Sequence, residues 1–173
     1  MSPIWVIRVA ESSFKLPRML VKNRILVAFV AFLLFLALAA TASARGLSAS
    51  ESSLLRAMDG VRTSHGLAPL RLDYRLERVA RSHSLSMLRG HYFSHGSFAA
   101  RLRASGAAGP IFGEDLAWGP ASASWIVNAW LTSPEHRANL LRPGFRRVGV
   151  GAVIGRFEGS AGAMVVTADF AGT

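Results

Sequence analysis

The sequence predicts an α+β fold, in which a small antiparallel sheet of about three strands is covered by four or five helices. Apolar residues recur at helical spacing in several segments after residue 50. Two β-rich segments then follow each other near the C-terminus, joined by a loop bounded by glycines. Helices followed by consecutive strands, without strict alternation, are typical of an antiparallel sheet with helices packed on it.

The predicted helices begin and end at residues that favour helix ends. They cover residues 50–64, 73–90, 97–105, 122–131 and 134–141. Ser50 or Ser52 can cap the first helix and Asp73 the second, because their side chains can accept hydrogen bonds from free backbone N–H groups. Ser133 precedes Pro134, and a serine followed by proline at the first helical position indicates the start of the last helix.

Three segments are expected to form strands. They lie within residues 110–119, 148–152 and 163–170. The first is bounded by glycine and proline, the second alternates valine with glycine, and the third is rich in β-branched residues. Residues 155–162 are expected to form the hairpin loop between the last two strands.

The N-terminal segment has the three parts of a secretory signal. Five basic residues precede an unbroken apolar run, Ile25–Ala40, and Ala42-Ser43-Ala44 is a small-residue cleavage site. We expect residues 1–44 to be a signal peptide or an uncleaved N-terminal membrane anchor, with Met19 as an alternative start. A linker (45–51) and one domain (52–173) follow, either secreted or held at the outer face of the cytoplasmic membrane.

Charge and cysteine content exclude several classes of function. The chain has eighteen arginines, two lysines and a net charge of +10, but its arginines form no dense stripe with interleaved aromatics. We therefore expect no nucleic-acid partner and favour a lipid, glycan or cell-wall polymer as the partner. We expect contact with a membrane only through the N-terminal segment. The absence of cysteine excludes disulfides, thiolate metal sites and cysteine nucleophiles.

Two histidines and one carboxylate are the candidate functional residues. His95 lies in a non-helical turn, and His136 lies in the first turn of a predicted helix, where the helix dipole favours a neutral imidazole. Glu114 lies in an apolar stretch, so its carboxylate must find hydrogen-bond donors or a cation. By contrast, His65 is expected to cap a helix end and His83 to be a hydrogen-bonded core residue.

Several short motifs, in this order, resemble the CAP superfamily of cysteine-rich secretory, antigen 5 and pathogenesis-related proteins. They are Val61-Arg62, Gly66-Leu67-Ala68-Pro69-Leu70, His83-Ser84, Phe93-Ser94-His95, Gly113-Glu114-Asp115-Leu116-Ala117, Trp130, Ser133-Pro134, His136-Arg137-Ala138-Asn139, Val148-Gly149-Val150-Gly151 and Val166-Thr167. The chain is most similar to the small exported bacterial branch (SCP-like domains). The resemblance implies an α-β-α sandwich with a central cavity.

The resemblance also implies which residues line that cavity. His95 and His136 correspond to the two histidines of the family and Glu114 to its first acid. Ser133 stands where the second acid is usual, so the set is incomplete. Asp115 replaces an asparagine usual after the glutamate and is not counted as the missing acid. Glu135 is nearer the right place, although helix geometry can direct it outward. His95, His136 and Glu114 could then hold a divalent metal such as zinc, although no obligate cofactor is expected.

Three functions follow from these residues. The first is a binding module for a lipid, glycan or cell-envelope ligand, with weak metal binding at His95, Glu114 and His136. The second is an extracellular hydrolase with His136 as general base and Glu114 as its orienting carboxylate, although the chain has no Gly-x-Ser-x-Gly or His-Glu-x-x-His motif. The third is a purely structural envelope domain. We favour a non-enzymatic role.

Overall fold

A computed structural model describes residues 46–172, and a compact unit begins at Leu47. The predicted signal peptide or anchor (1–44) lies outside the described residues. The first described helix, α2 (Ala49–Ser64), begins inside the segment predicted to be a linker. Within the described part, no helix combines the length and the apolar character needed to cross a bilayer.

Four strands form one sheet in the order β1-β3-β4-β2. They are β1 (Arg71–Leu72), β2 (Phe112–Gly119), β3 (Phe145–Phe157) and β4 (Ser160–Gly172). β4 pairs antiparallel with both β2 and β3, whereas β1 pairs parallel to β3. The sheet is therefore mixed and has one strand more than predicted, because no strand was predicted at the two residues of β1.

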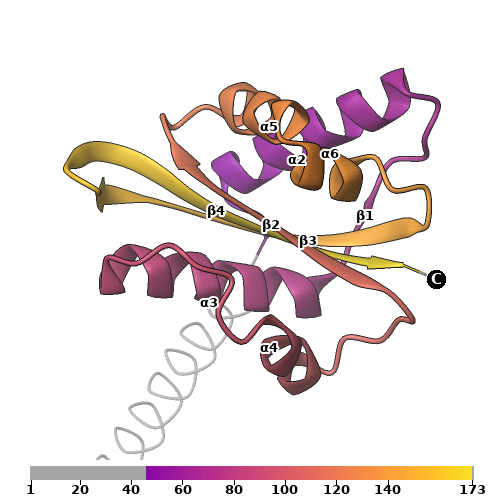
Figure 1. Cartoon of the computed structure of the whole chain (residues 1–173), viewed down its shortest axis with the longest axis horizontal. Coiled ribbons are helices and arrows are strands. Elements are labelled where there is room, and N and C mark those ends of the chain that lie inside the picture. Colours follow the sequence, from indigo (N-terminus) through magenta and orange to yellow (C-terminus); the bar gives the residue numbers. More distant parts are fainter. Residues whose placement is uncertain (1–45, 173) are drawn as a thin grey trace, which may run out of the picture. The chain divides into compact units, whose positions relative to one another are not determined.

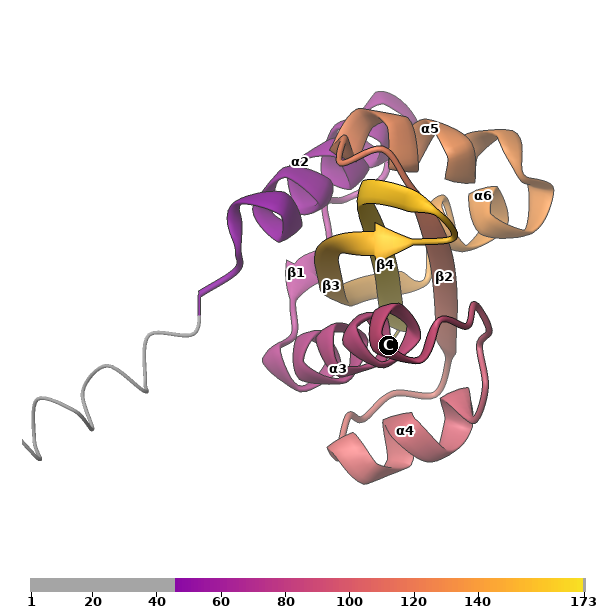
Figure 2. The ribbon, with the colours of Figure 1, turned by 90° about the vertical axis from the view of Figure 1, so that its left-hand side faces the viewer.

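Helices cover both faces of this sheet, as Figures 1 and 2 show. α3 (Tyr74–Gly90) and α4 (Phe98–Ser105) lie on one face, called here the α3/α4 face. α2, α5 (Ala123–Thr132) and α6 (Pro134–Leu140) lie on the other, the α2/α5/α6 face. This arrangement confirms the predicted α-β-α sandwich, with five helices among the described residues.

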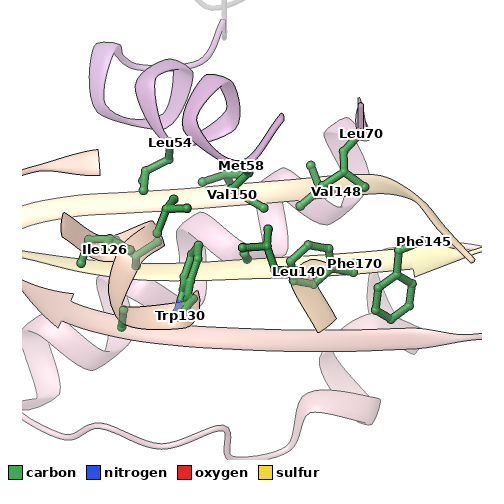
Figure 3. Close-up of a cluster of buried hydrophobic side chains, with 14 of the residues drawn as sticks. Leu54, Met58, Leu70, Ile126, Trp130, Leu140, Phe145, Val148, Val150 and Phe170 are labelled. Atoms are coloured by element: carbon green, nitrogen blue, oxygen red, sulfur yellow. The ribbon is translucent and has the colours of Figure 1, made fainter. Parts of the chain in front are cut away.

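The α2/α5/α6 face holds one continuous apolar core, part of which is drawn in Figure 3. Leu54 and Met58 from α2, Trp130 from α5 and Leu140 from α6 are buried there against Val148, Val150 and Phe170 of the sheet. The indole Nε1 of Trp130 donates to the carbonyl of Leu116 at 3.0 Å, so its one polar atom is satisfied.

Arg62 is fully buried among these apolar residues. Its guanidinium donates to the backbone carbonyls of Ala68, Leu140 and Phe145 at 3.0, 2.7 and 3.0 Å. It therefore joins the end of α2, the end of α6 and the start of β3. Burial lowers the pKa of Arg62, but an arginine remains charged at neutral pH.

On the α3/α4 face the apolar core is divided into two clusters, and α3 lies directly against the backbone of β3. Met87, Leu116, Phe157, Ala163 and Val165 form one buried cluster, and Leu76, Leu102 and Ala171 form another. Gly149 and Gly151 of β3 lie directly under α3: a Cβ on them would lie 2.0 and 2.2 Å from backbone atoms of the helix. Only glycine permits this close approach.

Local side-chain bonds fix the starts of the two long helices. Asp73 caps α3 by accepting from Arg75 N at 2.9 Å, as predicted. Ser48, not Ser50 or Ser52, caps α2, and it forms a capping box with Glu51. Oε1 of the buried Glu51 also accepts from Arg81 Nε at 2.8 Å and from the Ala152 N–H at 3.3 Å. The start of α2 is thereby tied to α3 and to β3.

Candidate functional site

Glu114 is the centre of a buried polar cluster on the α3/α4 face. It is the third residue of β2, and only 2% of its side chain is exposed. His95 Nδ1 donates to Glu114 Oε1 at 2.8 Å, and the guanidinium of Arg101 donates to Oε2. Both carboxylate oxygens are therefore engaged, which offsets the cost of burying the charge.

His95 lies in the loop between α3 and α4, with 56% of its side chain exposed. Two side chains hold the backbone of this loop: His83 Nε2 donates to the Ser94 carbonyl at 2.9 Å, and Arg101 donates to the His95 carbonyl at 2.6 Å. His83 is the buried, hydrogen-bonded histidine that the sequence predicted. The imidazole of His95 is thus fixed at its Nδ1 edge, while more than half of its side chain remains open to solvent.

Asp169 is a member of the cluster that sequence reasoning missed. It is the direct cross-strand neighbour of Glu114 on β4 and is fully buried. Neither of its carboxyl oxygens has a hydrogen-bond donor among the described residues. Burial and the adjacent charge of Glu114 raise the pKa of Asp169 well above its usual value. Both effects favour the protonated form of Asp169, which can donate a hydrogen bond to Glu114.

The structure places His136 near this cluster without bonding it to Glu114. His136 is the third residue of α6 and is half-buried. Burial lowers the pKa of His136, and the nearby His95 lowers it further, which favours the neutral imidazole. No hydrogen bond joins its side chain to another described residue, so the proposed base and orienting carboxylate of a hydrolase are not paired.

Ser133, the residue at the position of the missing acid, joins α5 to α6. It is half-buried and occupies the N-cap position of α6, but its hydroxyl makes no capping hydrogen bond. Ser133-Pro134 does mark the start of α6, as predicted, but the hydroxyl of Ser133 accepts from none of the free N–H groups of the first turn.

Asp115 lies on the opposite face of β2 from Glu114 and connects the strand to α6. Asn139 Nδ2 donates to Asp115 Oδ1 at 2.8 Å and to the Glu114 carbonyl at 3.4 Å. The second oxygen of Asp115 has no donor among residues 46–172. Burial, with a contribution from the charge of Glu114, raises the pKa of Asp115 to about 8. Burial therefore favours the protonated form of both acids beside Glu114, Asp115 and Asp169.

The predicted zinc set does not fit this arrangement. Within residues 46–172, no group of three or more histidine and acidic side chains is placed to hold a metal ion. Arg101 puts a positive charge on the Glu114 oxygen that a metal would need, and the Nδ1–H of His95 takes the other oxygen. The metal site stays a prediction from resemblance, and we derive no chemistry through it.

A groove runs along the outer side of α5 and α6. Its volume is about 660 Å³, and its apolar lining comes from Leu131, Pro134, Ala138, Leu141 and Pro143. Arg137 and Arg142 also line it. The helix that carries His136 therefore forms one wall of an apolar groove with two cationic side chains.

The fold and the site together define a class: a three-layer α-β-α domain in which a histidine pairs with a buried glutamate of the edge strand β2. A model of the cysteine-rich secretory protein (CAP) family matches residues 55–170, and the chain belongs to this family. That match spans the elements from α2 to β4 and confirms the resemblance seen in the sequence.

Individual relatives are bacterial. Protein YkwD of Bacillus subtilis is 33% identical over 118 residues, which cover 65% of this chain and 46% of YkwD. An extracellular SCP-domain protein of Bacillus anthracis has a similar structure, with a TM-score of 0.62, 26% identity, and coverage of 72% of this chain and 40% of that one. The chain thus spans less than half of each of these relatives.

A second similar structure supports the fold alone. An outer surface protein of Borrelia burgdorferi superimposes with a TM-score of 0.60 at 22% identity, over 72% of this chain and 93% of that one. The arrangement of helices on the sheet is therefore shared with a protein of very different sequence.

Proposed function

We propose that this chain is an exported binding module of the cell envelope, which takes an anionic amphiphile such as a fatty acid or lipid in the α5–α6 groove. The single observation that carries the proposal is the lining of that groove. Apolar side chains can bury an acyl chain, and Arg137 or Arg142 can pair with its acidic headgroup.

The polar cluster has a positioning role in this proposal. Asn139 holds α6 to β2 through Asp115 and the Glu114 backbone, and Glu114 is held by His95 and Arg101. The cluster therefore keeps the wall of the groove in place. A location outside the cell is supported by the signal-like N-terminal segment and by similarity to a protein described as extracellular.

A fluorescent fatty acid added to the domain (47–173) tests the proposal. Ala138→Trp should lower its affinity at least tenfold, because an indole at this exposed position fills the groove. Ala99→Trp is the matched control: Ala99 is also an exposed helical alanine but lies outside every groove described here, so affinity should be unchanged. Equal affinity in wild type and Ala138→Trp would refute the assignment of the groove.

A purely structural role is the second candidate, and one observation favours it. Both oxygens of Glu114 are occupied by protein donors, as expected of a group that holds loops together. If the domain binds neither the fatty acid nor any envelope polymer, while Glu114→Gln lowers its melting temperature, the structural role is the better account.

A further inference from the structure

Acidic and basic side chains of this domain are segregated between the interior and the surface. Of the nine acids in residues 46–172, only Glu135 and Glu158 are exposed. The exposed arginines are far more numerous: Arg56, Arg71, Arg75, Arg78, Arg89, Arg103, Arg137, Arg142, Arg146 and Arg156. The surface is therefore more cationic than the net charge of the domain suggests.

The outer surface of α3 and α4 carries no exposed acid. Between residues 74 and 110 the one acid is Glu77, which is buried and contacts Arg81. Arg75, Arg78, Arg89 and Arg103 are all exposed over the same length. An anionic partner therefore meets no repulsive charge on this surface.

Two hollows lie in a row along α3 and share Ser82. One, of about 360 Å³ between α3 and α4, is lined by Arg78, Val79, Arg101 and Ser105, among others. The other, of about 470 Å³ at the end of α3, is lined by Leu85, Ser86, Arg89 and Tyr92. Arg78 and Arg89 lie ~16 Å apart along the helix axis. Both hollows are thus lined by arginine, by serine and by a small apolar surface.

We propose that these hollows form an extended docking groove for a linear, phosphodiester-linked polymer of the cell envelope. Arg78 and Arg89 pair with two separate phosphates of one polymer chain, the serine hydroxyls bond to polyol or sugar oxygens, and Tyr92 contacts the carbon backbone of the polymer. The proposal rests on the proposed function only in placing the domain at the cell envelope, because the groove is separate from α5 and α6.

The shape of this surface favours a chain molecule over a flat bilayer. Its arginines and serines line hollows, which a thread-like polymer can enter. Of the exposed large apolar residues, Tyr74 lies at the start of α3, and Tyr92 and Phe93 lie just beyond its end; no residue between these two ends exposes a large apolar side chain. A bilayer surface would need such side chains to insert along the helix.

Binding of poly(glycerol phosphate) to the domain, measured by calorimetry at 50 and 200 mM NaCl, tests the proposal. Arg78→Gln with Arg89→Gln should weaken binding at least tenfold and reduce its salt dependence, because two phosphate contacts are lost. Arg56→Gln with Arg146→Gln removes the same charge from exposed sites away from the hollows and should change affinity less than threefold.

Three results would overturn the docking groove. Equal losses in the two double variants would show that binding follows net charge alone. No binding of the polymer by the wild-type domain at 50 mM NaCl would remove the partner, and so would binding to phosphatidylglycerol vesicles without binding to the polymer. Fatty-acid uptake is measured separately, so failure here is distinguishable from failure of the proposed function.

Discussion

The two faces of the sheet are built in different ways. On the α2/α5/α6 face, large side chains fill the space between helices and strands in one continuous cluster. On the α3/α4 face, α3 touches the backbone of β3 at Gly149 and Gly151, and a buried polar cluster around Glu114 separates two small apolar clusters.

The two faces therefore depend on different features of their side chains. The α2/α5/α6 face depends on the volume of its side chains. The α3/α4 face depends on the missing side chains of two glycines in β3 and on the charge pairs around Glu114. The second face is also where a loop histidine, His95, reaches the surface from a buried carboxylate. Each of the following predictions tests whether the two faces respond as differently as their construction requires.

The largest effect is expected from Gly149→Ala. The added Cβ would lie 2.0 Å from the backbone nitrogen of Glu77, and backbone cannot move aside unless α3 lifts from the sheet. The free energy of unfolding, measured in urea, should fall by about 3 kcal/mol or more. Gly155→Ala is the control: its Cβ meets only the flexible side chain of Leu88, so a similar loss there would contradict this account.

On the opposite face, Arg62→Met should lower the free energy of unfolding by about 2 kcal/mol. Methionine fills much of the same volume but leaves the carbonyls of Leu140 and Phe145 without their buried donor. Arg56→Met, at an exposed position of the same helix, should cost less than about 0.5 kcal/mol in the same urea titration. Equal effects at both positions would show that the carbonyl bonds of Arg62 contribute little.

Asp115→Asn should stabilise the domain by about 1 kcal/mol or more at pH 8. Since the pKa of Asp115 is raised to about 8 in the folded state, the unfolded chain loses this proton near pH 4 while the folded domain keeps it. Stability therefore falls as the pH rises from about 4 to 8. The asparagine variant lacks this proton, and its melting temperature should depend less on pH.

The control for Asp115→Asn is the wild-type domain, with both proteins measured at pH 4 and at pH 8. At pH 4 the two proteins should melt at nearly the same temperature, because the burial of a carboxylate then costs the wild type little. A wild type that is the more stable of the two at pH 8 would show that the carboxylate of Asp115 has a partner that the structure does not record.

The smallest effect is expected from zinc. Because Arg101 and His95 occupy Glu114, an excess of zinc should change the melting temperature of the domain by less than ~1 °C. A rise that disappears in His95→Ala would instead support the metal site implied by the family resemblance, and would mean that Arg101 moves away from Glu114.

The sequence predicted helix positions well, because helix ends depend on local chemistry. Asp73 was identified as a cap, and the predicted starts and ends of most helices agree with the structure to within one or two residues. The bounds of the strands were harder to predict. β3 and β4 each extend beyond their predicted bounds, because their pairing with each other, and not the local glycine-rich sequence, sets their length.

The candidate site was predicted in part. Glu114 and His95 do meet, but the sequence alone did not indicate Arg101 or Asp169 as their neighbours. No role was predicted for Arg101, although it lies three residues after Phe98 and so on the inner side of a short helix. Asp169 stands alone in an apolar strand, and a charge in such a run is the signal that could have found it.

The buried Glu51 has a consequence for how copies of this protein behave toward one another. β1 covers only residues 147 and 148 of β3, so the outer edge of β3 beyond Val148 has no neighbouring strand in the sheet. Glu51 accepts the Ala152 N–H at that edge, and the first turn of α2 is held beside it. A free strand edge is a template for aggregation. Because the start of α2 lies beside this edge, it hinders the pairing of β3 with a strand of another copy.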